Sequence, residues 1–129
     1  MRSIWSGLLT IVMVLTVSCN KKELDVKIVP EPAYIDVSDG FYKISSVSPL
    51  YISSDDDDLR MVAEYFQERL SISAGLKKDI KTNSKSGKGI HLSIGDLEFT
   101  DNSEGYELLV NGNSIKITGN TAKGVFYGV

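Results

Sequence analysis

The chain has 129 residues, of which 42% are hydrophobic and 24% charged, and it carries a formal net charge of −3 and one cysteine. This length allows one ordinary domain, and the composition is that of a globular protein. A weakly acidic chain lacks the basic footprint of nucleic-acid-binding proteins, and a single cysteine excludes a disulfide within the chain.

Residues 1–18 are predicted to be a lipoprotein signal peptide. Arg2 supplies a positive charge, and residues 4–17 form an apolar run shorter than a comfortable membrane span. The small residue before Cys19 resembles a bacterial lipobox, although Thr16 stands where an aliphatic residue is usual. We therefore expect cleavage before Cys19 and acylation of its thiol, with an ordinary secretory signal as the alternative.

Acylation at Cys19 would anchor an exported protein to a bacterial membrane, in the periplasm or at the cell surface, because more than one acyl chain holds a protein stably to a bilayer. Residues 19–27 are polar and charged, and they are predicted to be a tether between lipid and domain.

The segment that follows the tether is rich in strand and turn signals. Pro30 and Pro32 exclude a central strand, so residues 28–37 are predicted to be an edge strand or an extended lead-in. A turn at residues 38–40 should lead into strands at 41–44 and 49–53.

An amphipathic helix is predicted next, because apolar residues recur with helical spacing from Leu59 to Leu70. Gly75 suits the position after its last turn. Four aspartates, residues 55–58, precede the helix. They could bind a hard cation, but the spacing of an EF-hand loop is missing, and negative charge at a helix N-terminus is stabilising by itself. We therefore interpret them as a helix cap and expect no metal or cofactor.

Residues 77–89 contain five lysines among serines and glycines and are predicted to be a surface loop around a short strand at 79–81. Residues 90–94 alternate apolar and polar side chains, which predicts a half-buried strand with His91 on its polar face. A single histidine without a neighbouring cysteine does not indicate a metal site, and catalysis by His91 would need partners that the sequence does not show.

A β-hairpin is predicted around residues 111–113, where Asn-Gly is a strong turn signal. A turn at 111–112 would pair Leu108 with Ile115. A turn at 112–113 would pair Leu108 with Ile117. Both registers keep the apolar side chains on one face, because a shift of two residues preserves side-chain parity.

The last ten residues, NTAKGVFYGV, predict the start of a helix capped by Asn120 or Thr121. Ala122, Val125, Phe126 and Val129 share one face. We expect this helix to be truncated at Val129.

The order of elements predicts an α+β domain over residues 28–129, with an antiparallel-rich sheet and two helices packed on one face.

Three segments resemble the N-terminal, non-catalytic domain of bacterial β-N-acetylhexosaminidases of glycoside hydrolase family 20. They are VPEPAYIDVSDGFYKI, LRMVAEYFQERLSISAG and GYELLVNGNSIKITGNTAKGVFYGV. The resemblance covers nearly the whole mature chain. It implies that a downstream (β/α)₈ barrel removes terminal N-acetylhexosamines from glycans, with an adjacent Asp-Glu pair that acts together with the substrate's acetamido group.

The resemblance assigns no catalytic residue to this chain. Adjacent Asp and Glu do not occur in it, and Glu64, Glu68 and Glu107 are predicted to be solvated surface acids. We therefore expect the chain to be inactive alone. The alternative is a free-standing lipoprotein that binds a glycan or a partner without turnover, through aromatic side chains such as Tyr42, Tyr51 or Tyr127.

Overall fold

The computed structural model describes residues 27–29, 31–82 and 87–129. The predicted signal peptide, Cys19 and all of the predicted tether except Lys27 lie outside these ranges. The chain divides into two units, Met1–Val37 and Ser38–Val129. The described residues of the first unit form no helix or strand. All elements below belong to the second unit.

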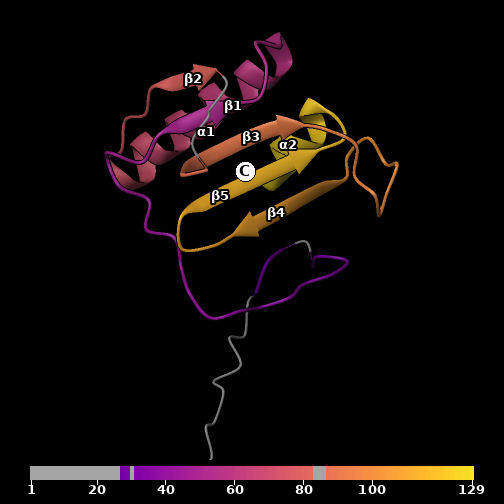
Figure 1. Cartoon of the computed structure of the whole chain (residues 1–129). Coiled ribbons are helices and arrows are strands. Elements are labelled where there is room, and N and C mark those ends of the chain that lie inside the picture. Colours follow the sequence, from indigo (N-terminus) through magenta and orange to yellow (C-terminus); the bar gives the residue numbers. More distant parts are fainter. Residues whose placement is uncertain (1–26, 30, 83–86) are drawn as a thin grey trace, which may run out of the picture. The chain divides into compact units, whose positions relative to one another are not determined.

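The second unit contains five strands and two helices within its described residues (Figure 1). In chain order they are β1 (Leu50–Ile52), α1 (Asp57–Ala74), β2 (Ile80–Thr82), β3 (Gly89–Ile94), β4 (Tyr106–Val110), β5 (Ser114–Gly119) and α2 (Ala122–Gly128). Neither helix is long and apolar enough to cross a membrane.

The strands form one sheet in the order β2-β1-β3-β5-β4. The prediction of an antiparallel-rich sheet is wrong, because three of the four strand pairs are parallel and only β4 and β5 are antiparallel. The reason is how the strands are connected. Helix α1 returns the chain so that β2 starts at the same end as β1. Strand β4 runs back along the edge, and the hairpin then inserts β5 parallel to β3.

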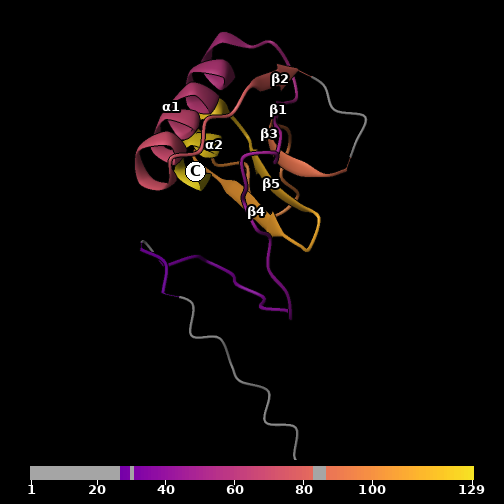
Figure 2. The same cartoon turned by 90° about the vertical axis from the view of Figure 1, so that its left-hand side faces the viewer.

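Both helices cover the same face of the sheet, as predicted, and leave the other face open (Figure 2). The core lies between the helices and the sheet. Its buried hydrophobic side chains are Leu50, Ile52, Leu59, Val62, Ala63, Ile90, Leu92, Ile117 and Val125. Burial of one such aliphatic side chain contributes about 1.5–3 kcal/mol, so these nine side chains are the main source of stability.

Helix α1 begins and ends where the sequence predicts. Asp56 is the N-cap, and its carboxylate accepts a hydrogen bond of 2.9 Å from the backbone N–H of Leu59. Gly75 adopts a left-handed conformation with φ of 66° and donates its N–H to the carbonyl of Ser71. This conformation closes the helix at little cost only for glycine.

The hairpin follows the second of the two predicted registers. Leu108 pairs with Ile117 and Val110 pairs with Ile115, which places the turn at residues 112–113. The Asn111 side-chain oxygen accepts a hydrogen bond of 3.0 Å from the backbone N–H of Ser114 and fixes this register.

The lead-in differs from the prediction. No described residue before Leu50 forms a strand, so the strand predicted at 41–44 is wrong. Tyr42 and Ile44 nevertheless pack against the core. Their apolar character therefore reflects packing against the core rather than strand pairing.

Two glycines let helix α2 lie close to the loop before β4 and to the sheet. A Cβ atom on Gly124 would lie 2.3 Å from the Gly105 carbonyl oxygen, and one on Gly128 would lie 2.5 Å from Cγ2 of Ile117. Thr121 caps the helix, as predicted, and accepts a hydrogen bond of 3.5 Å from the Gly124 N–H.

Candidate functional site

Two of the four aspartates at the start of α1 make side-chain contacts with the helix. Asp56 caps it, and Asp55 forms an ion pair with Arg60 that raises the pKa of the guanidinium above its ordinary value. Within the described ranges, no group of three or more histidine, cysteine or acidic side chains is placed to hold a metal ion. The prediction of a cap is confirmed for Asp56.

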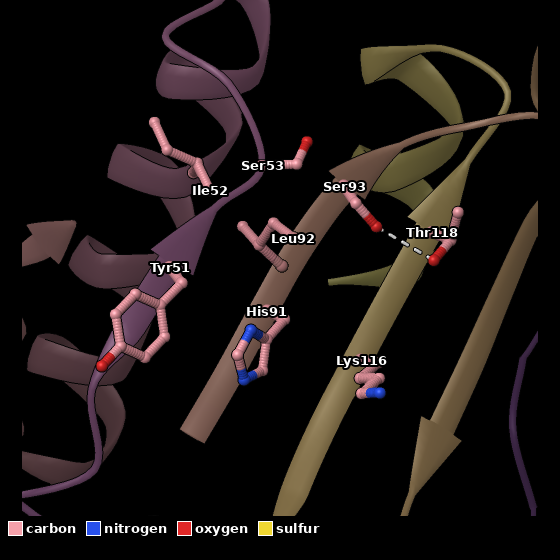
Figure 3. A pocket seen from close by; sticks show the side chains of 8 residues that line it. All are labelled: Tyr51, Ile52, Ser53, His91, Leu92, Ser93, Lys116 and Thr118. Atoms are coloured by element: carbon pink, nitrogen blue, oxygen red, sulfur yellow. Dashed lines mark hydrogen bonds between the residues drawn. The ribbon is translucent and has the colours of Figure 1, made fainter. Parts of the chain in front are cut away.

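The strands bring a row of four side chains together on the open face of the sheet. Tyr51 pairs in register with Lys81 on one side and with His91 on the other, and His91 pairs with Lys116. Their neighbours along the strands, such as Leu50 and Leu92, are buried under the helices. Because side chains alternate along a strand, the row points away from the helices, as Figure 3 shows for Tyr51, His91 and Lys116.

A shallow hollow of about 300 Å³ lies beside this row. Its lining residues are Tyr51, Ile52, Ser53, His91, Leu92, Ser93, Lys116 and Thr118 (Figure 3). The hydroxyl groups of Ser93 and Thr118 lie 3.0 Å apart and hydrogen-bond to one another. The hollow therefore combines two rings, one ammonium group and four hydroxyl groups, which belong to Tyr51, Ser53, Ser93 and Thr118.

His91 lies on the polar face of β3, as predicted, and is half-buried. Its ring stacks on that of Tyr51 with 5.1 Å between the ring centroids. Its Nε2 lies 3.1 Å from the carbonyl oxygen of Lys88. Neither contact is a carboxylate, so the described residues give His91 no partner for acid–base catalysis.

The outer surface of the helices carries a second cluster, which we call the helix-layer patch. It consists of the exposed side chains Met61, Tyr65, Phe126 and Tyr127. The rings of Tyr65 and Phe126 are 5.2 Å apart, and those of Phe126 and Tyr127 are 6.0 Å apart. This cluster therefore joins α1 to α2 on the side away from the sheet.

Strand β4 also exposes apolar side chains on the helix-covered face. Leu108 is 41% exposed and Val110 is 50% exposed. Ile117, the cross-strand partner of Leu108, is buried. Helix α2 reaches the sheet at Ile117 and Tyr106, where Gly128 makes its close approach. The sheet is therefore incompletely covered between this point and the hairpin.

The three tyrosines predicted as alternatives for sugar contact occupy different environments. Tyr42 packs against the core, Tyr51 lines the hollow, and Tyr127 belongs to the helix-layer patch. The structure therefore does not unite them in one site.

Lys78 is a buried cation that the sequence analysis did not single out. It is only 3% exposed, and its ammonium group donates a hydrogen bond to the carbonyl oxygen of Ser45. Burial lowers the pKa of Lys78 below its ordinary value. The bond from its ammonium group therefore ties the residues before β1 to the segment between α1 and β2.

The model of glycosyl hydrolase family 20, domain 2, matches residues 25–129. The chain belongs to this family. The match confirms the resemblance to an N-terminal, non-catalytic domain.

Among curated proteins, the chain is 27% identical over 105 residues to a β-hexosaminidase of Porphyromonas gingivalis. The alignment covers 81% of this chain and 13% of that protein. The chain therefore spans only a small fraction of the length of this relative.

Two solved structures share the fold. The β-N-acetylhexosaminidase of Streptomyces coelicolor A3(2) has a TM-score of 0.65 and 26% identity, over 75% of this chain and 19% of that one. The N-acetyl-β-hexosaminidase of Streptomyces plicatus, in complex with Thio-NAglucal, has a TM-score of 0.66 and 26% identity, over 78% and 19%. The α+β fold of this accessory domain is thus shared with family 20 hexosaminidases.

Proposed function

We propose that the chain is the N-terminal accessory domain of an exported, lipid-anchored β-N-acetylhexosaminidase, and that it packs beside a downstream (β/α)₈ barrel that removes terminal N-acetylhexosamines from glycans. The observation that carries the proposal is the family match over residues 25–129. The chain covers only 13% of the length of the Porphyromonas gingivalis relative and 19% of the Streptomyces coelicolor structure, which supports a domain within a longer protein.

The helix-layer patch supports docking of the barrel at the helices. Exposed aromatic side chains that contact one another mark an interaction surface more often than scattered apolar residues do. Tyr65 and Phe126 lie at its centre and come from different helices, so one partner surface would cover both.

The exposed side chains of β4 support a continuation of α2. Leu108 and Val110 face the helix side without a cover. A helix that continued past Gly128 along the sheet would pass over this region, since α2 already contacts Ile117 there. Residues beyond Val129 would then bury apolar surface and lead into the barrel.

An activity assay tests whether catalysis requires the downstream barrel. The 129-residue chain should not hydrolyse an aryl N-acetyl-β-glucosaminide above the rate of a buffer blank, because neither described face holds an acid paired with a second catalytic group. A chain extended to include the barrel should hydrolyse it. Turnover by the 129-residue chain alone would overturn the proposal.

A fractionation experiment tests the anchor. Cys19→Ala should move the protein from the membrane fraction to the soluble fraction, because the thiol that takes the lipid is lost. Membrane retention of the Cys19→Ala variant at the level of the parent protein would argue against acylation.

A stability comparison tests docking. Tyr65→Ser together with Phe126→Ser should lower the melting temperature of the barrel-containing protein more than that of the 129-residue chain, because only the longer protein buries the patch. Equal shifts in both proteins would exclude the helix-layer patch as the interface.

A further inference from the structure

The open face of the sheet carries a concentration of positive charge that the accessory role does not use. Lys81 and Lys116 lie in one row on this face, and both are exposed. Within the described residues neither has a carboxylate partner. The strands contain a single carboxylate, Glu107, which pairs with Thr118 on the edge of the same face. The strand side chains of this face therefore carry two positive charges and one negative charge.

We propose that the open face is a binding site for a uronic acid residue of an anionic glycan, with Lys116 as the partner of the carboxylate and the Tyr51–His91 ring pair beside the sugar ring. This proposal concerns the sheet face alone and is independent of docking at the helices.

The ring pair is suited to a sugar. Tyr51 and His91 stack with an interplanar angle of 22°, and both side chains line the hollow (Figure 3). The C–H groups of a pyranose pack favourably on such aromatic surface, which has an apolar body and a polar tip. Stacked partners also restrict one another's rotation, so little side-chain entropy remains to be lost on binding.

His91 adds a hydrogen-bond acceptor. The Lys88 carbonyl can only accept a hydrogen bond, so its contact of 3.1 Å places the proton of neutral His91 on Nε2. Nδ1 is then left as an acceptor for a sugar hydroxyl. Ser93 and Thr118 offer hydroxyl oxygens that can accept a hydrogen bond from a sugar hydroxyl, while they bond to one another and Ser93 lies 3.4 Å from the carbonyl oxygen of Ile117.

The residues that line the hollow carry few charges and several hydroxyl groups, which favours a uronic acid over a densely sulfated chain. Lys116 is the one cation among the lining residues of the hollow, which also carry four hydroxyl groups and two rings. A ligand with one carboxylate and several hydroxyl groups matches this set. The volume of about 300 Å³ lies at the lower end of the range for ligand sites, about 300–1,000 Å³.

Titration of the isotope-labelled 129-residue chain with trigalacturonate, followed by NMR, tests the proposal. Saturable shifts are expected at the backbone amides of His91, Ser93, Lys116 and Thr118. The fully methyl-esterified trisaccharide keeps the rings and loses the charge, so it should bind at least threefold more weakly. Salt should weaken trigalacturonate binding, because exposed charges are screened.

Three variants make the test specific. Lys116→Ala should weaken trigalacturonate binding at least threefold, while Lys123→Ala, which removes a lysine from the helix side, should leave it unchanged. Glu107→Gln should strengthen it, because a repelling carboxylate on the same face is removed. Lys116→Arg should restore most of the affinity lost in Lys116→Ala.

Four results would overturn the proposal. They are equal binding of the acid and its methyl ester, equal losses in Lys116→Ala and Lys123→Ala, shifts confined to the helices, and no saturable shift up to about 10 mM ligand. Tighter binding of a sulfated trisaccharide than of trigalacturonate would also reject a uronic acid as the occupant.

Discussion

The two faces of the sheet differ in what their side chains do. On the helix-covered face, Leu50, Ile90 and Leu92 are at most 1% exposed and form the core. On the open face, the residues between them, such as Tyr51 and His91, remain in contact with solvent. Adjacent residues of one strand therefore have different roles, one in core packing and the next on the solvent-exposed face. Substitutions on the covered face should act on stability, and those on the open face should act on binding.

The largest contrast is expected between neighbours on β3. Leu92→Ala should lower the free energy of unfolding by about 2–5 kcal/mol, because it leaves a cavity in a packed core. His91→Ala should cost less than about 1 kcal/mol, as is usual for a residue outside the core. Denaturant unfolding of both variants measures the difference. Equal costs would mean that the two faces are not distinct in stability.

A smaller contrast is expected between two glycines. Gly124→Ala should cost about 1–3 kcal/mol, because its Cβ would meet the backbone oxygen of Gly105 at 2.3 Å. Gly112→Ala should be neutral or slightly stabilising, since nothing lies within 4 Å of the added atom. Thermal unfolding of the two variants checks this. A neutral Gly124→Ala would show that α2 does not pack tightly on the sheet.

Substitution of Asp56 and of Asp58 should have different effects on stability, because only Asp56 caps the helix. Asp56→Ala should cost about 1 kcal/mol through loss of the hydrogen bond to Leu59. Asp58→Ala removes a negative charge from the first turn of α1, but Asp58 is not the N-cap, so this substitution should cost less. If both substitutions cost the same in denaturant unfolding, charge alone accounts for the effect of the aspartates.

The smallest effect is a dependence of stability on alkaline pH. The folded-state pKa of Lys78 lies below its ordinary value of 10.5, so the unfolded chain binds more protons between these two values. The free energy of unfolding contributed by Lys78 should therefore rise with pH through this window. Lys78→Met should remove that contribution, as unfolding of both proteins across the window would show. Parallel pH profiles would contradict it.

Local features of the fold could be predicted from the sequence because their signals are local. The Asp56 cap, the left-handed Gly75 and the hairpin each depend on residues within one turn or one loop. The direction of β1, β3 and β5 could not be predicted, because it depends on how helices and loops return the chain. The strand predicted at 41–44 was wrong because apolar residues there pack on the core without pairing.

The surfaces were harder to predict than the core. The helical spacing placed Phe126 on the buried face of α2 with Val125, but Phe126 is 43% exposed and contacts Tyr65 instead. The row on the open face emerges only from strand order and register, since Lys81, Tyr51, His91 and Lys116 are far apart in sequence. The one available signal was the alternation around His91, which placed it on a polar face.

We propose above all that this domain assists a catalytic barrel encoded with it. Sequencing the gene beyond the codon for Val129 tests the claim most directly. We predict an open reading frame that continues with apolar residues and then encodes a barrel with an adjacent Asp-Glu pair. A stop codon directly after Val129 would contradict it.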